Sequence, residues 1–241
     1  MQPIKVVWGM VSYGPFPYAP VYTSHMTAIA YASRHFTTTF LDGSTIRGVG
    51  ATDRAYTHAA ENRIVHDFLA IEDATHLFMT EMDMVLPTET LVQLADLNKP
   101  IASGLYFLRG GQGAPCLYVK GYPAPENPYT HSLVTVFPTE TPFKLGDKGG
   151  CPWLGCVLIA REVFEKVPFP WFDLKEKGYG SDMYFYTKVL EAGYEVWVDP
   201  RVRCGQMDYI TYSFEDYEKR VREEPKFQGA GFILGRDPVP A

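Results

Sequence analysis

Short apolar runs alternate with longer segments of helical periodicity over the first 107 residues of this chain. Strands are expected at 4–11, at 36–41, from residue 75 onward and at 100–107. Helices are expected between them, at 22–34, 55–70 and 88–98. We expect Thr88 to cap the last of these helices and Glu89 to lie in its first turn. This alternation is typical of an α/β fold in which a doubly wound, mostly parallel central sheet carries helices on both faces.

The alternation breaks down after residue 108. Residues 109–150 are rich in Gly, Pro, Tyr and Thr, and are expected to form an irregular, β-containing insertion with short strands near 116–120 and 133–137. Regular elements then return as a strand at 151–160, helices at 161–167 and 182–192, a strand at 195–198, and a C-terminal helix near 213–224. No linker is long enough to divide the chain, so residues 1–241 are predicted to form a single domain.

The composition is that of an acidic, globular protein. A net charge of −6 argues against a nucleic-acid partner, because such a partner requires a basic surface. The four cysteines are scattered and are expected to be buried thiols rather than disulfide or zinc ligands. The N-terminal residues do not resemble a signal peptide, and no apolar run approaches the roughly 18 residues of a membrane span. We therefore expect a cytoplasmic protein without a transmembrane segment.

Two acids stand one residue apart in the stretch 75–87, THLFMTEMDMVLP. Alternate side chains of a strand share a face, so Glu81 and Asp83 are expected to leave the strand together. Burying two carboxylates among Leu, Phe and Met side chains costs free energy unless a positive group meets them. Mg²⁺ or Mn²⁺ carrying phosphates suits such acids, and ligands of open α/β sheets collect beyond the carboxyl ends of the strands. A solvated acidic turn after an ordinary strand would give the same sequence.

Three segments resemble the nucleotide-sugar-dependent glycosyltransferases of the GT-A fold, close to the family-2-like group. Residues 78–85, FMTEMDMV, stand where that family carries an Asp-x-Asp motif at the end of a strand. Residues 155–163, GCVLIAREV, are similar to the strand and helix start before its catalytic loop. Residues 180–200, GSDMYFYTKVLEAGYEVWVDP, resemble its Glu-Asp motif with the following helix and strand. Residues 61–63, ENR, resemble an Arg/Asn pair on the helix before the metal strand.

The resemblance implies a glycosyltransferase of the hexosyltransferase type with a GT-A-like fold. Such an enzyme moves a sugar from a nucleotide-sugar donor to a hydroxyl acceptor on a glycan, a lipid or a small molecule. Mn²⁺ or Mg²⁺ bridges the donor diphosphate and stabilises the leaving group. Asp83 matches the metal ligand, and Glu81 matches the acid that meets the ribose or metal-bound water. Asp182 matches the general base, which suits inversion at the anomeric carbon.

Two positions depart from the family pattern. The Glu-Asp pair is Ser181-Asp182 here, so one acid is missing, and Ser181 is expected to cap the helix and contact substrate. The family commonly places a metal-binding His after its last strand. Gln206 stands there in this chain and Asp208 follows two residues later. An oxygen of either residue suits a hard cation, so both are candidate metal ligands.

The resemblance also suggests residues for the substrates. Tyr13 lies where the nucleotide would pass and is a candidate to stack on the base, while Asp42 is a candidate to hydrogen-bond its edge. Arg63 is a candidate to offset the charge of the diphosphate. Trp153 and Trp171 suit stacking against a sugar ring. Each of the five also fits an ordinary structural role in a loop, on a solvated helix face or in an aromatic core.

By the same resemblance, the predicted domain has four parts. Residues 1–108 form a nucleotide-sugar-binding half, 109–150 the insertion, 151–212 an acceptor and catalytic half, and 213–241 a C-terminal helix and tail. Two other functions remain open. A nucleotidyltransferase-like enzyme shares the arrangement of nucleotide, metal and acids, and Ser181 and Gln206 also fit a non-catalytic carbohydrate- or nucleotide-binding module.

Overall fold

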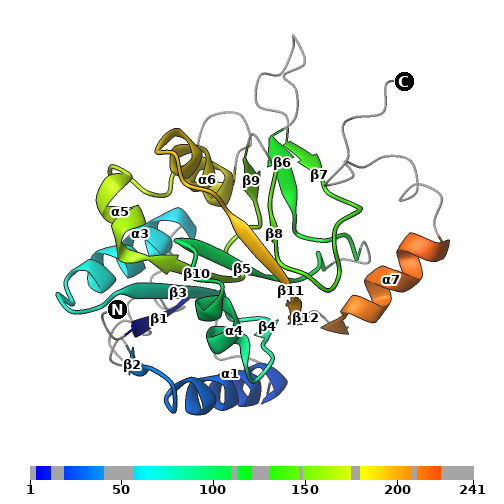
Figure 1. The fold of residues 1–241 in the computed structure, drawn as a ribbon, viewed down its shortest axis with the longest axis horizontal. Helices are drawn as coiled ribbons and strands as arrows, with labels where there is room; N and C mark the ends of the chain where they lie inside the picture. Colours follow the sequence, from blue (N-terminus) through cyan, green and yellow to red (C-terminus); the bar gives the residue numbers. More distant parts are fainter. Residues whose placement is uncertain are drawn as a thin grey trace, which may run out of the picture.

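A seven-stranded sheet forms the centre of the protein in a computed structural model of the chain (Figure 1). The structure describes residues 4–11, 19–40, 57–109, 113–120, 131–146, 149–174, 180–207 and 211–223. Across the sheet the strands are β2 (Thr37–Phe40), β1 (Lys5–Val11), β3 (His76–Glu81), β10 (Cys156–Ala160), β5 (Ile101–Leu105), β11 (Trp197–Arg203) and β8 (Phe143–Lys144). Strands that are far apart in the sequence therefore lie in one sheet.

Most of the strands run in one direction. Strand β1 pairs in parallel with β2 and β3, and β5 pairs in parallel with β11. Strand β10 lies between β3 and β5 and is antiparallel to both, and β8 is antiparallel to β11 at the edge. The sheet is thus mostly parallel with one reversed central strand. The sequence does not show this reversal, because a strand buried on both faces is apolar whichever way it runs.

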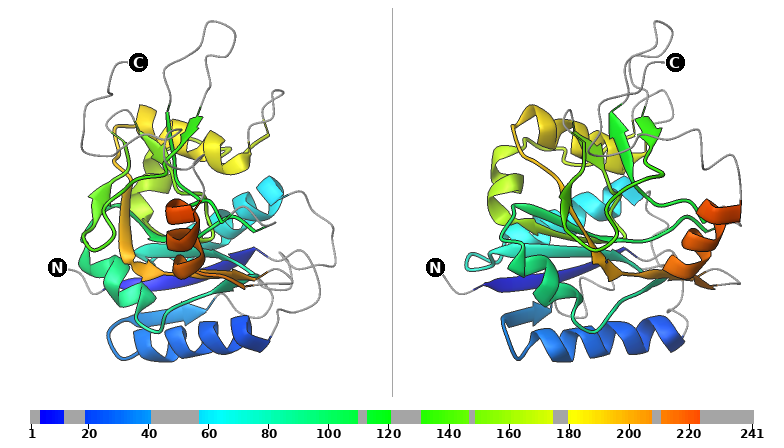
Figure 2. Two further views of the ribbon diagram at one scale, coloured as in Figure 1. Left: turned by 90° about the vertical axis from the view of Figure 1, so that its right-hand side faces the viewer. Right: turned by 45° about the vertical axis from the view of Figure 1, so that its right-hand side comes forward.

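Helices cover both faces of the sheet (Figure 2). Helices α1 (Ala19–Ala32) and α4 (Thr90–Asp96) pack on one face, and α3 (Thr57–Leu69), α5 (Arg161–Lys166) and α6 (Ser181–Glu191) pack on the other. On β3, Phe78 packs in the α1 and α4 cluster, whereas Leu77 and Met79 pack with α3, α5 and α6. The predicted fold class is confirmed: α/β, with a mostly parallel central sheet and helices on both faces.

Helix α3 packs on the strands that lead into the site. Its buried residues Ala60, Ile64, Val65 and Phe68 recur at helical spacing and form one stripe. The stripe comes very close to β1 at Gly9, where a Cβ atom would lie 2.4 Å from Ile64 Cγ2. A side chain at position 9 would push the helix away from the sheet, so glycine sets the spacing of these two elements.

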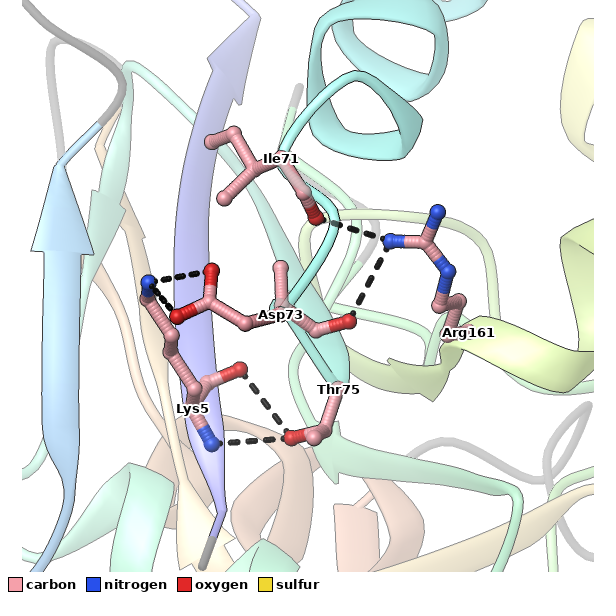
Figure 3. A network of polar contacts seen from close by, with 6 residues as sticks. Lys5, Ile71, Asp73, Thr75 and Arg161 are labelled. Atoms are coloured by element: carbon pink, nitrogen blue, oxygen red, sulfur yellow. Dashed lines mark hydrogen bonds and ion pairs between the residues drawn. The ribbon is translucent and has the colours of Figure 1, made fainter.

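A polar network fixes the turn between α3 and β3 (Figure 3). The Arg161 guanidinium donates to the carbonyl of Leu69, the last residue of α3, at 2.8 Å. It also donates to the carbonyls of Ile71 and Ala74 in the following turn at 2.9 and 3.3 Å. Thr75 Oγ1 accepts a bond from the Lys5 backbone N at 2.8 Å. The start of β3 is thereby fixed to α5 and β1.

Two smaller sheets flank the central one. Strands β13 (Thr211–Tyr212), β12 (Gly205–Met207) and β4 (Met84–Val85) form the first, and β7 (His131–Leu133), β6 (Tyr118–Lys120) and β9 (Gly150–Cys151) form the second. Pairing of β12 with β4 places Gln206 beside Met84. Helix α7 (Phe214–Glu223) packs Phe214 and Tyr217 against Phe107.

Several expected boundaries differ from those observed. Helix α4 begins at Thr90 with Glu89 as its N-cap residue, so the cap assigned to Thr88 was wrong. Thr90 instead closes the preceding turn, because its Oγ1 donates to the Pro87 carbonyl at 2.7 Å. The N-cap residue of α6 is Gly180, and Ser181 is the first helical residue rather than the cap.

The expected strand at 133–137 overlaps β7 only at Leu133. All four cysteines are buried thiols. None of the helices in the described part of the chain is both long and apolar enough to cross a membrane.

Candidate functional site

A cavity of about 510 Å³ opens where β3 ends. Helix α3 contributes Thr57 and Glu61 to its lining, and β3 contributes Glu81. The remaining described lining residues come from the segment after β5, from the loops around β10 and α5, from the start of α6 and from β12: Leu108, Arg109, Trp153, Leu174, Gly180, Ser181, Asp182, Met183 and Gln206. Of the residues named from the sequence, Glu81, Trp153, Ser181, Asp182 and Gln206 are brought together here.

Glu81 and Asp83 do not leave the strand as a pair. Strand β3 ends at Glu81, and residues 82–83 form a turn before β4. The alternation of side chains along a strand therefore does not extend to Asp83. Glu81 is partly exposed in the cavity, whereas Asp83 is buried beside it at 8% exposure.

Asp83 lies in a small polar cluster at the edge of the cavity. Its Oδ2 accepts a bond from Arg109 Nη1 at 2.8 Å and one from Gln206 Nε2 at 3.3 Å. The Asp83 carboxylate therefore has a positively charged partner, which offsets the cost of burying it. Arg109 and Gln206 both line the cavity, so the cluster connects the buried acid to the open space.

A second acidic group lies across the cavity. Glu61 on α3 is 2% exposed and interacts with Ser181 and Asp182 at the start of α6. Burial raises the pKa of Glu61 well above its usual value, the negative charge of Asp182 raises it further, and a hydrogen bond from Ser181 opposes the rise. Glu61 therefore resists ionisation, and it shares a hydrogen bond with Asp182.

Glu81 and Asp182, the other two acids that line the cavity, also resist ionisation. Burial, with repulsion from Asp83 and Asp182, raises the pKa of Glu81 to about 8, although Arg109 acts in the opposite direction. Burial raises the pKa of Asp182 to about 7, and its hydrogen bond with Glu61 limits the increase. Perturbed carboxyl groups in a cleft are a feature of functional sites.

Three buried polar atoms at the cavity have no hydrogen-bond partner among the described residues. They are Glu61 Oε2, Trp153 Nε1 and Gln206 Oε1. A buried polar atom without a partner costs free energy, and most such atoms in native proteins are paired. Trp153 also adopts a positive φ of 54°, which is rare for a bulky residue and typical of functional sites. The cavity thus has the properties of a ligand site.

Besides Asp83, which contacts two lining residues without lining the cavity itself, two predicted site residues lie away from it. Arg63 lies on the exposed side of α3 and pairs with Asp67 at 3.1 Å. Trp171 is buried, and its indole N–H donates to the carbonyls of Phe164 and Val167. Tyr13, Asp42 and Asp208 lie outside the described residues.

Glu61 and Arg109 were not identified as functional from the sequence. Glu61 lies three, four and seven residues before Ile64, Val65 and Phe68, so it falls on the apolar stripe of α3. An acidic residue on the apolar stripe of a helix is unusual, and this position could have indicated a functional role for Glu61. Arg109 has no comparable signal, because its contact with Asp83 depends on how β5 and β3 are arranged in the sheet.

The candidate metal ligands that the structure describes are Glu81, Asp83 and Gln206. Asp83 Oδ2 already accepts bonds from Arg109 and Gln206, so a cation at that oxygen would have to displace Arg109. Among the described residues, no group of three or more His, Cys, Asp or Glu side chains is placed to hold a metal ion. The mechanism proposed below therefore assigns no step to a metal.

Comparisons with known proteins support the fold only. No protein-family model and no curated protein sequence matches the chain. The structure of A197 from STIV aligns over 99% of this chain and 97% of its own, with a TM-score of 0.56 and 16% identity, which shows a shared fold.

Two other solved structures align more loosely. A nucleoside-diphosphate-sugar pyrophosphorylase from Vibrio cholerae RC9 has a TM-score of 0.40 at 10% identity, over 80% of this chain and 90% of its own. A glycosyltransferase involved in glycosylation of the major capsid of PBCV-1 has a TM-score of 0.32 at 12% identity, over 98% of this chain and 82% of its own. Similarity at these TM-scores supports no statement about function.

Proposed function

We propose that this protein transfers a sugar from a nucleotide-sugar donor to a hydroxyl acceptor. The observation that carries the proposal is the convergence of Glu61, Glu81 and Asp182 on one cavity that also contains Arg109 and Trp153. The cavity lies at the carboxyl end of β3, where open α/β sheets bind their ligands. Its volume of about 510 Å³ is within the usual range for small-molecule sites.

Asp182 is the proposed general base. With a pKa raised to about 7 by burial, its carboxylate is basic enough to take a proton from an acceptor hydroxyl and is still substantially ionised at neutral pH. The hydroxyl oxygen then attacks the anomeric carbon as the bond from that carbon to the diphosphate breaks. A single displacement of this kind inverts the anomeric configuration, and the nucleoside diphosphate leaves with the bonding electrons.

The other cavity residues have supporting roles in this proposal. Protonated Glu61 donates to the Asp182 carboxylate and fixes its orientation. Glu81, with a pKa of about 8, is mostly protonated at neutral pH. It can therefore donate a hydrogen bond to a hydroxyl group of the nucleotide sugar. Trp153 stacks against Tyr118 with ring centroids 5.7 Å apart, and its N–H can meet a sugar oxygen.

Replacement of the proposed base tests this function. Nucleoside diphosphate release would be measured from UDP-, GDP- and dTDP-sugars, with and without hydroxyl acceptors, for the wild type, Asp182→Asn and Glu191→Gln. Glu191 is an exposed acid at the far end of α6 and serves as the matched control. We expect Asp182→Asn to fold but to lose at least about a hundredfold in rate, as removal of a general base does, while Glu191→Gln keeps its rate.

Other outcomes would separate the alternatives. Full activity of Asp182→Asn would remove the base role. Formation of a nucleotide sugar with release of pyrophosphate would instead indicate nucleotidyl transfer. Binding of nucleotide sugars without turnover in any combination would indicate a binding module.

A further inference from the structure

Arg109 is the only positively charged side chain among the described residues that line the cavity. Its side chain is 56% exposed, and its bond to Asp83 is its one side-chain hydrogen bond with the described residues. A guanidinium group has five N–H donors in a planar arrangement, and most of those of Arg109 have no partner among the described residues. This arrangement matches phosphate oxygens, which arginine binds in a bidentate manner.

Asp83 holds Arg109 at the cavity. The acid is buried at 8% exposure, so its ion pair is less screened by water than a surface pair would be. Gln206 of β12 bonds to the same carboxylate oxygen and so helps to hold the Asp83 side chain. The guanidinium is thus positioned by Asp83, which Gln206 supports, before any ligand arrives, and this reduces the entropy lost on binding.

A metal ion and Arg109 would compete for the same carboxylate. Binding a cation through Asp83 Oδ2 requires that Arg109 leave it, and the displaced guanidinium would remain beside the new positive charge. An anion that binds Arg109 does not have this obstacle.

We propose that Arg109, held by Asp83 and Gln206, binds the diphosphate of the nucleotide-sugar donor and supplies the positive charge that related chemistry takes from a metal ion. The inference rests on the proposed function, since it identifies what holds the leaving group. As the bond from the sugar to the diphosphate breaks, the guanidinium stabilises the negative charge that develops on the diphosphate oxygens.

Binding of nucleoside diphosphates tests the inference without any turnover. UDP, GDP and dTDP would be titrated calorimetrically into the wild type, Arg109→Met, Asp83→Asn and Arg34→Met, each in EDTA and in Mn²⁺. Arg34 is an exposed arginine beyond α1 and is the matched control. We expect at least one nucleotide to bind to the wild type in EDTA. Arg109→Met should lower the affinity for that nucleotide at least about tenfold, and Arg34→Met should leave the affinity unchanged.

The Asp83→Asn variant separates the two sources of charge. The amide oxygen of the Asp83→Asn variant can still accept the bond from Arg109, so the guanidinium stays positioned and nucleotide binding in EDTA is retained. A site that needs a metal would lose its best ligand. This variant decides the question even if Arg109→Met does not fold, which thermal unfolding would reveal.

Three results would overturn the inference: binding that requires Mn²⁺, binding that is lost in Asp83→Asn, or equal binding by folded Arg109→Met. Each of these leaves the proposed function standing. Absence of nucleotide binding in both EDTA and Mn²⁺ would overturn the proposed function as well.

Discussion

The pairing of Glu61 with Asp182 shows how two identical chemical groups take different roles. Both are carboxyl groups, but Glu61 is 2% exposed on α3 while Asp182 is partly exposed at the cavity. Burial and the charge of Asp182 raise the pKa of Glu61 well above its usual value, which favours a proton on Glu61 and a carboxylate on Asp182, the proposed base. Glu61 thus brings a second acid to Asp182 from a different helix.

The raised pKa of Glu81 has a consequence for stability. Its pKa is about 8 in the folded state, against about 4.5 when exposed, so unfolding releases a proton between these values. Stability therefore falls as the pH rises through this window, by up to about 1.4 kcal/mol per pH unit for this group. A neutral amide at the same position does not have this dependence.

We predict that Glu81→Gln raises the melting temperature at pH 8.5 and changes it little at pH 4.5. The increase is expected to be about 2–4 °C for each kcal/mol recovered. Thermal unfolding followed by circular dichroism at both pH values measures it, with the exposed Glu89→Gln as control. An identical shift at both pH values would mean that Glu81 is ionised in the native state at low pH as well.

At the scale of elements, the site depends on how the loop after α5 is held on α3. Asn62 Nδ2 donates to the carbonyls of Phe172 and His58 at 2.6 and 2.7 Å. Its Oδ1 accepts the backbone N–H groups of Trp171 and Phe172 at 3.0 and 3.2 Å. One side chain thereby holds the start of the loop, and Leu174 a few residues later is part of the cavity lining.

We predict that Asn62→Ala destabilises the protein by about 1–3 kcal/mol, because it leaves several backbone groups of this loop without partners. The next residue provides the control. Arg63→Ala removes only an exposed pair with Asp67 on the same helix and should cost at most about 0.5 kcal/mol. Urea unfolding of both variants measures the difference, and equal losses would show that the loop does not depend on Asn62.

The elements themselves could be predicted well, but their arrangement could not. The helix expected at 55–70 is α3 at Thr57–Leu69, because the spacing of apolar residues is a local property. The reversed direction of β10 and the contact of Arg109 with Asp83 depend on pairing between distant segments. For the same reason, Asp182 could be named from its local motif, whereas its partner Glu61, 121 positions earlier in the chain, was missed.

At the scale of the whole molecule, the cavity combines distant parts of the chain. The N-terminal part supplies Glu61 and Glu81, and the later part supplies Trp153, Asp182 and Gln206. The chain carries a net charge of −6, so its overall field repels a nucleotide sugar. Recognition of such a donor therefore has to come from local groups, of which Arg109 is the cationic one in the described lining.

The most direct test of this account is a crystal structure of the protein with a bound nucleoside diphosphate. We expect electron density for the diphosphate in the cavity, within hydrogen-bonding distance of the Arg109 guanidinium. We also expect the Asp182 carboxylate to face the position of the transferred sugar. Density for the nucleotide at another surface, with the cavity between Glu81 and Asp182 unoccupied, would contradict it.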